Sequence, residues 1–449
     1  MSDAIAQLVR EAGIVGAGGA GFPTHVKFGA KADTVIANGA ECEPLLRCDK
    51  AVLQDRAEAV LQGLTVLADA TAAKRLVLAL KGHHRDLVRH VRGVAGRVAP
   101  AVEIFELHNY YPAGDEQQLV HDVTGRVVPE GGIPLQVGAV VSNVVTLTQV
   151  TDAVRHRRPV TRRPLTVAGA VRHTVTRELP IGAPMRLAVE LAGGATVPAW
   201  RIIEGGPMMG RAVTDPDEPI SKRTSGVLVL PADHPLILRG TAPPAREVRL
   251  GRVVCCQCRM CTDLCPRYNL GHALEPHLVM RALGTEAIGS LAPTAHVTAA
   301  YLCCLCGVCE VYACPLMLSP RKVYVQFRQE LAKAGQANPH RRTDCQPHDF
   351  RNHRRVPLPR LVARLGLTEY LDVPHTVDWT EPEVAGVCLR LDQHTGAPAR
   401  PVVAVGQRVR VGDLVGEIPE GKLGARYHAS IDGVVTAVGA ASVEIASAP

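Results

Sequence analysis

Residues Cys255–Pro266 read CCQCRMCTDLCP, and residues Cys303–Pro315 read CCLCGVCEVYACP. These two stretches hold ten of the 14 cysteines in the chain of 449 residues. In each stretch three cysteines are separated by two residues, a fourth cysteine follows, and a proline comes directly after it. This spacing is typical of loops that bind [4Fe–4S] clusters, where three thiolates wrap one corner of a cubane and a distant cysteine completes the site.

In proteins with two such clusters, the distant cysteine comes from the opposite motif. The predicted ligand sets are Cys255, Cys258, Cys261 and Cys314 for one cluster, and Cys303, Cys306, Cys309 and Cys265 for the other. Zinc is the alternative, but zinc sites usually combine two ligand pairs that lie ten or more residues apart, or include histidine. Cys256 and Cys304 each follow the first ligand of a motif, and we interpret them as small buried neighbours.

A glycine-rich stretch lies near the N-terminus, where residues 13–28 read GIVGAGGAGFPTHVKF. Gly16, Gly18 and Gly21 match the pattern G-x-G-x-x-G. A dinucleotide fingerprint follows a strand, whereas the preceding residues Ala4–Glu11 predict a helix. The pattern alone therefore does not indicate a Rossmann fold.

The glycine-rich stretch still has the properties of a binding loop. Glycines expose backbone N–H groups and allow a flat or phosphorylated ligand to come close. Lys27 is a candidate partner for a phosphate, and Phe22 and Phe28 are candidates for stacking on a ring. The alternative is a flexible loop without a ligand.

Three further motifs follow the glycine loop and give it a context. The set GAGGAGFPTHVK, NGAECEP, GDEQQL and SNVVTL occurs in this order. It resembles the FMN- and NADH-binding subunit of respiratory complex I, and it is even more similar to RnfC and to the PduS-like cobalamin reductases. The resemblance implies an N-terminal α/β domain that binds FMN and NADH.

The resemblance also implies roles for particular residues. The glycine loop covers FMN and NADH, the second motif holds the flavin ring edge, the acidic pair of the third approaches the nicotinamide as the catalytic pair, and the fourth contacts the flavin phosphate. The residues carried over, in that order, are Gly16, Gly18, Gly19, Gly21, Phe22 and Lys27, then Asn38 and Glu41, then Asp115 and Glu116, and finally Asn143. Ala17 and Ala40 depart from the complex I pattern, which has Arg and Asp at these places, so the flavin environment is expected to differ.

The resemblance extends over most of the chain and implies a multidomain α/β protein. EGGPMMG (204–210) resembles part of an SLBB β-grasp domain, and EPHLVMRALG (275–284) resembles the cobalamin-reductase branch. The expected domains are an FMN/NADH-binding domain (1–160), an SLBB β-grasp domain (161–245), a helical ferredoxin-like domain with two [4Fe–4S] clusters (246–335), a linker (336–395) and a lipoyl-like barrel-sandwich hybrid (396–449). Lys422 lacks the flanking residues of a lipoylated hairpin, so we expect the last module to serve in packing or docking.

Charge and hydropathy exclude several classes of protein. The formal net charge is only +7, and no basic stripe with interleaved aromatic residues occurs, so nucleic-acid binding is not expected. The N-terminus lacks the basic start and apolar core of a signal peptide. No apolar run reaches the roughly 18 residues that a membrane span needs. We therefore expect a cytoplasmic protein without a membrane span.

Together the motifs predict an NADH-dependent oxidoreductase. NADH gives a hydride to FMN, FMN passes single electrons to the two [4Fe–4S] clusters, and the resemblance implies cobalamin as the acceptor, in support of a B12-dependent diol dehydratase pathway. An RnfC-like subunit that donates to a protein partner, and an iron–sulfur relay without a working flavin site, remain as alternatives. The expected partners are cobalamin or a cobalamin-handling adenosyltransferase and a shell protein, within or on a bacterial microcompartment.

Overall fold

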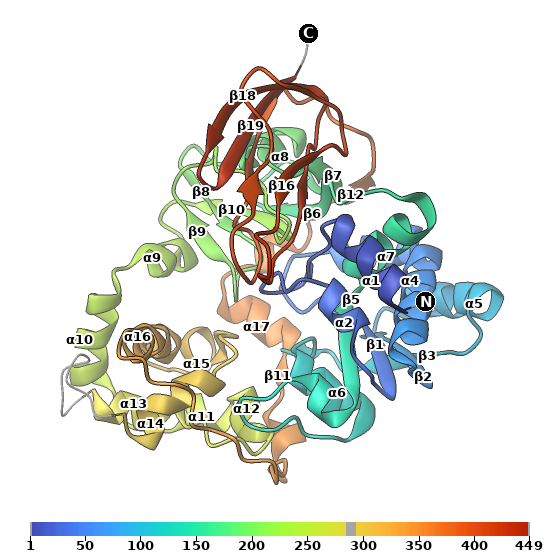
Figure 1. The fold of residues 1–449 in the computed structure, drawn as a ribbon. Coiled ribbons are helices and arrows are strands. Elements are labelled where there is room, and N and C mark those ends of the chain that lie inside the picture. The colour runs from blue at the N-terminus through green and yellow to red at the C-terminus, as the bar shows by residue number, and fades with distance from the viewer. Residues whose placement is uncertain (1, 284–292, 448–449) are drawn as a thin grey trace.

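The computed structural model describes residues 2–283 and 293–447 (Figure 1). It contains an N-terminal α/β domain, a β-grasp domain, a helical module that carries the cysteine loops, and a C-terminal module of short strands. This confirms the predicted multidomain α/β fold class. Gly284, the last residue of the EPHLVMRALG segment, lies outside the described residues. Within the described ranges, no helix is both long and hydrophobic enough to cross a membrane.

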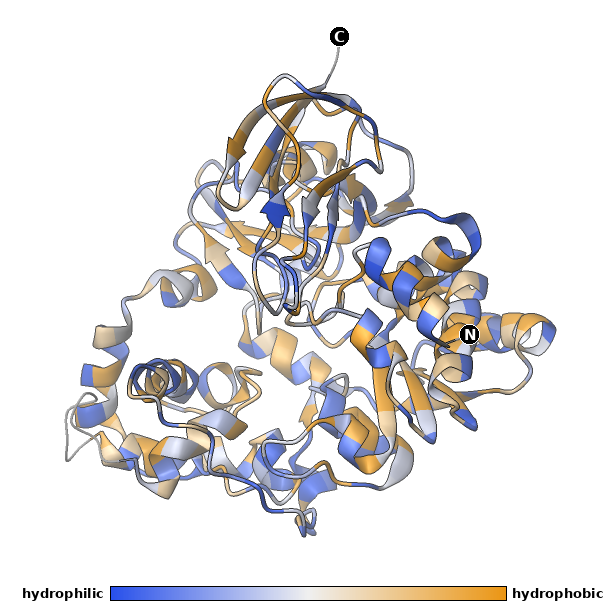
Figure 2. Cartoon of the chain, in the orientation of Figure 1, coloured by the Kyte–Doolittle hydropathy of each residue, from blue (hydrophilic) through white to orange (hydrophobic). Residues whose placement is uncertain are grey.

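The N-terminal domain is built on a four-stranded parallel sheet in the order β3-β2-β1-β5. Its central strands β1 and β2 are mostly buried because helices cover both faces of the sheet, and Figure 2 shows them largely in the hydrophobic colours. The strands are β1 (Thr34–Gly39), β2 (Arg75–Lys81), β3 (Val102–Leu107) and β5 (Ala139–Asn143), with the short β4 (Tyr110–Tyr111) outside the sheet. The helices are α1 (Ser2–Glu11), α2 (His25–Phe28), α3 (Cys48–Asp55), α4 (Ala57–Thr71), α5 (Arg85–Val98), α6 (Glu116–Thr124) and α7 (Val144–His156), with a 3₁₀ turn at Pro134–Val137.

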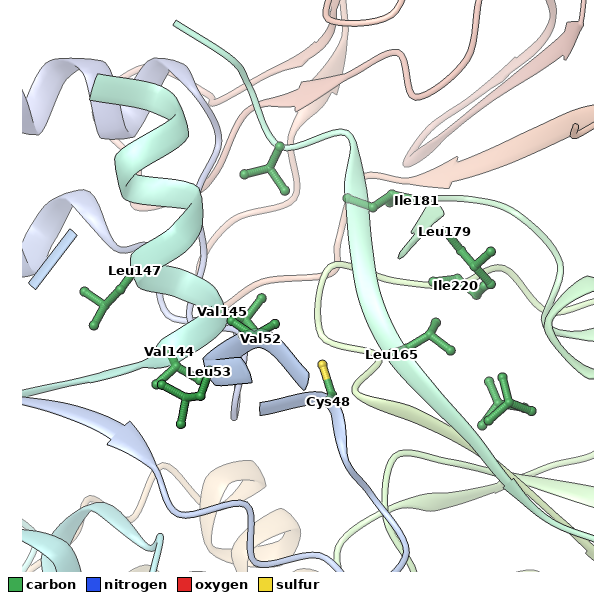
Figure 3. Packing of buried hydrophobic residues seen from close by; sticks show 14 of the residues in the cluster. Cys48, Val52, Leu53, Val144, Val145, Leu147, Leu165, Leu179, Ile181 and Ile220 are labelled. Carbon is green, nitrogen blue, oxygen red and sulfur yellow. The ribbon is translucent and has the colours of Figure 1, made fainter. Parts of the chain in front are cut away.

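Helices α4 and α7 pack closely on one face of this sheet. A Cβ at Gly63 would come within 2.1 Å of the Leu147 carbonyl oxygen, so glycine is required where the two helices approach. The apolar cluster around Leu53, Val144 and Leu147 continues into the next domain at Leu165 (Figure 3). One hydrophobic core therefore joins the first two domains.

The β-grasp domain contains a six-stranded sheet in the order β12-β7-β6-β10-β8-β9. The elements are β6 (Arg162–Gly169), β7 (Thr174–Pro180), α8 (Met185–Leu191), β8 (Trp200–Glu204), β9 (Arg211–Val213) and β10 (Gly226–Pro231). The edge strand β12 (His375–Asp378) comes from a distant part of the chain and pairs in parallel with β7. The β-grasp sheet is thus completed by residues that the sequence analysis assigned to the linker.

The cysteine module is a set of short helices around a small apolar core of its own. Its helices are α9 (Pro235–Thr241), α10 (Pro244–Val254), α11 (Met260–Asp263), α12 (Pro266–Asn269), α13 (Pro276–Ala282), α14 (Ala295–Thr298), the 3₁₀ turn Ala299–Leu302, α15 (Val308–Val311) and α16 (Pro320–Lys333). Val279, Leu302 and Tyr324 belong to this core and are at most 5% exposed.

Residues 336–378 form what we call the strap, which runs from the cysteine module back over the N-terminal domain. Its elements are a 3₁₀ turn (Arg351–Arg354), β11 (Val356–Pro357), α17 (Leu358–Arg364), a second 3₁₀ turn (Thr368–Tyr370) and β12. Strand β11 pairs with β4 of the N-terminal domain. In Figure 1, α17 lies between the cysteine module and the N-terminal domain.

The C-terminal module consists of two small antiparallel sheets. The strands are β13 (Gly386–Arg390), β14 (Arg400–Pro401), β15 (Arg408–Val409), β16 (Leu414–Glu417), β17 (Tyr427–His428), β18 (Gly433–Gly439) and β19 (Ser442–Ser447). The segment before β14 contacts the glycine loop, because the Thr395 N–H donates to the Gly21 carbonyl oxygen at 3.0 Å. This module therefore helps to hold the glycine loop in place.

Candidate functional site

Two asparagines mark the carboxyl edge of the parallel sheet. Asn38 lies near the end of β1, Asn143 ends β5, and the two are direct register partners. Strands β2 and β3 lie on one side of β1 and β5 lies on the other, so the strand order reverses between β1 and β5. Open α/β sheets bind ligands at such a point, outside the carboxyl ends of the strands. The sheet thus brings two of the predicted site residues to its natural binding position.

Asn143 also begins helix α7. Its Oδ1 accepts a hydrogen bond from the Val145 N–H at 2.9 Å, and its Nδ2 donates to Asp49 Oδ2 at 3.0 Å. Gly18 lies against this amide, since a Cβ at Gly18 would come within 3.2 Å of the Asn143 side chain. The N-terminal N–H groups of α7 and the glycine loop therefore lie together, an arrangement that suits a phosphate.

The glycine loop has an enclosed part and an open part. The Gly16 N–H donates to the Phe22 carbonyl oxygen at 2.9 Å, and Phe22 is partly buried. Gly21 is buried and has a φ of +72°, a conformation that favours glycine. Gly18 and Gly19 are exposed, and a Cβ at Gly19 would meet no atom within 4 Å. Gly18 and Gly19 are thus the glycines open to a ligand.

Lys27 joins the glycine loop to the predicted acidic pair. Its Nζ lies 3.6 Å from Glu116 Oε1 and donates to the Val141 carbonyl oxygen at 2.6 Å. The Glu116 side chain is 49% exposed, so this ion pair is open to solvent. The expectation that Phe28 stacks on a ring is wrong, because α2 turns Phe28 into the core with 0% exposure.

The other member of the acidic pair, Asp115, is already engaged by protein groups. It caps α6 by accepting hydrogen bonds from the N–H groups of Gln117 and Gln118 at 3.2 Å. It also forms a nearly buried ion pair with Arg267 of the cysteine module, with Nη2 and Oδ2 2.9 Å apart. Arg267 was missed by sequence reasoning because its partner lies 152 positions away. Asp115 therefore ties the cysteine module to the edge of the parallel sheet.

Asn38 and Glu41 shape the loop after β1. Asn38 Nδ2 donates to the Gly114 carbonyl oxygen at 2.9 Å. The Glu41 carboxylate accepts hydrogen bonds from the N–H groups of Asp49 and Lys50, both at 3.1 Å. Burial raises the pKa of Asp49 to about 7, and the adjacent Glu41 adds to the rise. Asp49 can therefore hold a proton near neutral pH at the edge of the site.

Sequence reasoning also missed Lys81, the last residue of β2. Its side chain is 2% exposed, and its Nζ has no hydrogen-bond partner among the described residues. A buried ammonium without an acceptor is unfavourable, so a ligand that supplies one fits here. The available signal was a lysine at the end of the apolar run RLVLALK. A phosphate-binding end at Asn143 and a donor at Lys81 together fit FMN.

A second group that was missed is Glu43, inside the NGAECEP motif. Its carboxylate accepts hydrogen bonds from the N–H groups of Met208 and Met209, at 2.8 and 3.0 Å. Gly206 makes this possible, because a Cβ there would lie 2.2 Å from Glu43 Oε2. Burial raises the pKa of Glu43 to about 7. The EGGPMMG loop of the β-grasp domain is therefore bound to the loop after β1.

The two cysteine loops have the same backbone form. Gln257 and Leu305, at equivalent positions, have φ values of +55° and +59°, and Arg259 and Gly307 have values of +68° and +78°. Residues in this left-handed conformation bend each loop around a small space. Within one loop, the Leu305 N–H donates to the Cys303 Sγ at 3.4 Å. Backbone N–H groups that point at sulfur suit cluster ligands.

Each cysteine loop lines a small cavity together with the fourth cysteine of the other loop. The cavity that we call far has a volume of about 20 Å³, and its lining includes Cys255, Cys258, Cys261 and Cys314. The cavity that we call near has a similar volume of about 20 Å³, and its lining includes Cys303, Cys306, Cys309 and Cys265. The structure brings together the same two sets of four cysteines that the spacing predicts.

The thiols in these cavities fit a metal cluster. Burial raises the pKa of Cys261 to about 12 and that of Cys303 to about 11. Thiolates in such surroundings require a metal, which stabilises the deprotonated form. The expectation that the neighbouring cysteines are buried is wrong for Cys256, which is exposed, whereas Cys304 is half-buried.

The near cavity adjoins the N-terminal domain directly. The Tyr111 hydroxyl donates to the Cys306 carbonyl oxygen at 2.8 Å. Gln118 Nε2 donates to the Pro266 carbonyl oxygen, also at 2.8 Å. Together with the Asp115–Arg267 ion pair, these bonds hold the near cavity against the loops around the parallel sheet.

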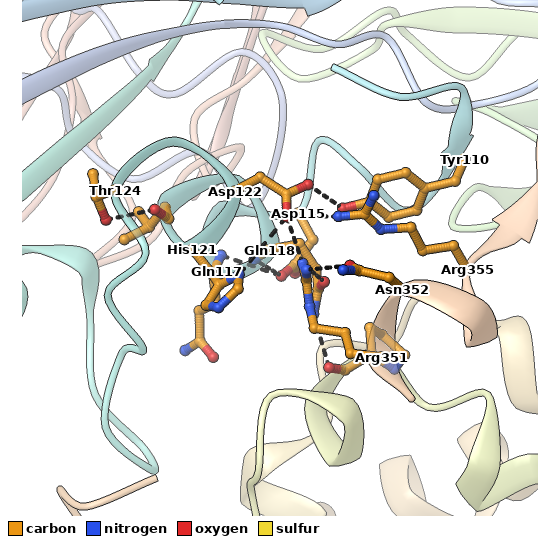
Figure 4. Close-up of polar contacts among 12 residues, drawn as sticks. Tyr110, Asp115, Gln117, Gln118, His121, Asp122, Thr124, Arg351, Asn352 and Arg355 are labelled. Carbon is orange, nitrogen blue, oxygen red and sulfur yellow. Dashed lines mark hydrogen bonds and ion pairs between the residues drawn. The ribbon is translucent and has the colours of Figure 1, made fainter. Parts of the chain in front are cut away.

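The strap reinforces this junction through a buried polar network, which Figure 4 shows. Asp122 accepts hydrogen bonds from the Tyr110 hydroxyl at 2.6 Å, from Arg351 at 2.7 Å and from Arg355 at 3.0 Å. Arg351 also donates to the Gln118 side chain at 2.7 Å. Burial alone would raise the pKa of Asp122, but the adjacent His121, the charge of Arg351 and the hydrogen bond from Tyr110 hold it well below its usual value.

Comparison with protein families matches four parts of the chain to described domains. Residues 9–152 match the Nuo51 FMN-binding domain, 164–212 the SLBB domain, 254–319 a 4Fe-4S dicluster domain, and 379–448 the RnfC barrel sandwich hybrid domain. The chain thus carries an FMN-binding domain and a domain for two [4Fe–4S] clusters, and both predicted cofactor types are confirmed.

Individual relatives cover the whole chain or part of it. The chain is 42% identical to cobalamin reductase PduS of Salmonella typhimurium over 99% of its own length and 96% of that protein. It is 36% identical to one component of the Na(+)-translocating ferredoxin:NAD(+) oxidoreductase complex of Acetobacterium woodii, over 59% of this chain and 58% of that component. A crystal structure of an NAD+-reducing [NiFe]-hydrogenase in its H2-reduced state matches with 23% identity and a TM-score of 0.50, over 76% of this chain and 64% of that one, which supports the fold alone.

Proposed function

We propose that this chain, which belongs to the family of the PduS cobalamin reductases, oxidises NADH and reduces cobalamin. It is an oxidoreductase. The observation that carries this proposal is the 42% identity to a cobalamin reductase over nearly the full length of both chains. The FMN-binding domain and the dicluster domain supply the cofactors that such a reaction needs.

The proposed order of electron transfer follows the packing of the two cavities. When bound, FMN accepts two electrons as a hydride, and the clusters carry electrons onward one at a time. Tyr111, Gln118 and Asp115 hold the near cavity against the N-terminal domain. The far cavity contains the exposed Cys258. Electrons would therefore enter at the near cavity and leave from the far one.

We assign the chain's own groups to distinct tasks in this reaction. Gly18 lies beside Asn143, and both Gly18 and Gly19 are exposed, so a phosphate would bind at this part of the loop. Lys27 and Glu116 form the exposed rim that NADH would meet. Asp115, which already pairs with Arg267, would act by positioning the cysteine module rather than by touching the nicotinamide.

The partners follow from the proposed acceptor. Cobalamin, or an adenosyltransferase that handles it, would receive electrons on the side of the far cavity. We propose that the protein works in the cytoplasm, within or on a bacterial microcompartment, with a shell protein as a further partner. The similarity to the PduS proteins of two organisms supports this placement.

One anaerobic experiment tests the proposed function. Purified protein loaded with FMN and both clusters is mixed with NADH, and then with cob(III)alamin or with a generic dye. We expect the flavin absorbance to bleach first, the cluster absorbance to fall afterwards, and cobalamin to be reduced with repeated turnover. Reduction of the dye without reduction of cobalamin would contradict cobalamin as the acceptor and would favour donation to a protein, as the similarity to the Acetobacterium woodii protein suggests.

A further inference from the structure

Strand β2 ends in a buried lysine. Lys81 is 2% exposed, and its Nζ has no hydrogen-bond partner among the described residues. Burying an amine without an acceptor is strongly unfavourable, and proteins rarely keep such a group unless something binds it. The partner of Lys81 is therefore expected to come from a bound molecule.

The direction of the Lys81 side chain follows from its place in the strand. Side chains alternate between the two faces of a strand. Val77 and Ala79 face the apolar cluster that contains Leu119 of α6, and Lys81 is the next residue with the same orientation. Asn38 lies on this face as well, because its amide donates to Gly114 just before α6. Lys81 and Asn38 thus share the face on which the flavin is proposed to lie.

The distance along the sheet edge suits FMN. Strand β1 separates β2 from β5, and neighbouring strands lie about 4.8 Å apart, so the ends of β2 and β5 are roughly 10 Å apart. The phosphate-binding features gather at the end of β5, around Asn143 and Gly18. An FMN molecule that places its phosphate there extends its ring system across β1 toward β2. At that end, Lys81 lines an open cavity of about 900 Å³ together with Glu41 and Glu43.

Glu41 and Glu43, which line the cavity with Lys81, form their hydrogen bonds with backbone groups and not with the Lys81 ammonium. Glu41 accepts hydrogen bonds from the N–H groups of Asp49 and Lys50, and Glu43 accepts them from Met208 and Met209. Gly39, the last residue of β1, pairs with Leu80, so the residue that follows the strand, the apolar Ala40, comes next to the Lys81 end of β2, where the complex I pattern has an aspartate. Burial raises the pKa of Cys42, which interacts electrostatically with Lys81.

We infer that Lys81 binds the ring end of FMN, where its ammonium supplies a hydrogen-bond donor and a positive charge. This inference rests on the proposed function, since it requires FMN in the N-terminal domain. Reduced flavin carries two more electrons than oxidised flavin, so a positive charge beside the ring stabilises the reduced form more. Lys81 is thereby a positioning and potential-setting residue for the flavin.

The test compares Lys81→Met with the wild type and with a matched control. Met keeps the length of the side chain and removes the charge. Lys74→Met is the control, because Lys74 is exposed and lies just before the opposite end of the same strand. FMN is titrated into flavin-free protein that retains its clusters, and binding is followed by quenching of flavin fluorescence. We expect affinity for oxidised FMN to fall by about tenfold in Lys81→Met and to stay unchanged in Lys74→Met.

The flavin potential provides a second readout. In Lys81→Met, we expect the affinity for reduced FMN to fall tenfold more than the affinity for oxidised FMN. This difference lowers the two-electron potential of the bound flavin by about 30 mV. Lys81→Arg should restore most of the potential. The melting temperature without FMN should rise in Lys81→Met by about 2–4 °C, because a buried charge without an acceptor is removed, and FMN should then stabilise the variant less than the wild type.

The outcomes separate the inference from the proposed function. Wild-type protein that binds no FMN would overturn both. Wild-type binding with equal affinity, potential and FMN-dependent melting in Lys81→Met would overturn the role of Lys81 alone. Unchanged cluster EPR signals in every variant show that the fold is intact.

Discussion

The near and far cysteine loops share a sequence pattern and a backbone form, but they differ in how far the rest of the protein buries their cysteines. In the near loop Cys306 is buried, and its carbonyl oxygen receives a hydrogen bond from Tyr111 of the N-terminal domain. In the far loop the equivalent Cys258 is exposed. The cysteine motif thus determines which cofactor each loop binds. The residues packed around each loop determine which group exchanges electrons with that cofactor.

The largest expected effect comes from removing one cluster at a time. Cys306→Ser and Cys258→Ser should each lower the iron content from about eight to about four per chain, since each removes a ligand of one cubane. In Cys258→Ser, NADH should still reduce the near cluster. In Cys306→Ser, NADH should leave the far cluster oxidised although dithionite reduces it.

EPR spectra recorded after each reductant check this order. Wild-type protein reduced by dithionite is the control for full cluster content. Equally rapid reduction of the far cluster by NADH in Cys306→Ser would show that electrons do not enter at the near cluster.

The second prediction compares two arginines, one beside each loop. Arg267 forms a nearly buried ion pair with Asp115, so Arg267→Met leaves a buried carboxylate without its partner and should cost about 3–5 kcal/mol in free energy of unfolding. The Arg259 side chain is 45% exposed and lies 3.6 Å from Asp263, so Arg259→Met should cost only about 0–1 kcal/mol. Urea unfolding midpoints of the two variants measure the difference. Equal midpoints would mean that the Asp115–Arg267 pair does not hold the junction.

The cysteine loops were predictable because their chemistry is local. Cys255, Cys258 and Cys261 lie within seven positions of one another, and a cluster imposes the loop shape on any sequence that binds it. The partner cysteines, Cys314 and Cys265, followed from the repeat of the motif. The order of the domains followed from the resemblance of several motifs, not from any single one.

The junction around the near cavity was not predictable. Arg351 and Asp122 are separated by 229 positions, and the Arg-rich segment that contains Arg351 was assigned to a linker. Burial decides the importance of Lys81 and Glu43, and burial of a single polar residue has no periodicity in the sequence. Phe28 was a candidate for stacking because an aromatic residue near glycines suits a ring, yet the same residue type also fills cores.

The last and smallest predicted effect is a pH dependence of the free energy of unfolding, which arises at Glu43 on the side of the near cavity. Burial raises the pKa of Glu43 from 4.5 in the unfolded chain to about 7 in the folded one. The folded state therefore binds the proton more tightly, so the stabilisation is fully present below pH 4.5 and is lost as the pH rises to about 7. The loss is about 3.5 kcal/mol at most, because a difference of one in pKa corresponds to about 1.4 kcal/mol. Glu43→Gln keeps an acceptor for Met208 or Met209 and does not titrate, so its unfolding free energy should fall less than that of the wild type between about pH 5 and about pH 8.

Urea unfolding at both pH values measures this difference, and parallel pH profiles for the two proteins would contradict a protonated Glu43 at the junction. The far cluster's EPR signal should stay the same throughout, because Glu43 binds the β-grasp loop on the near side and not the far cavity.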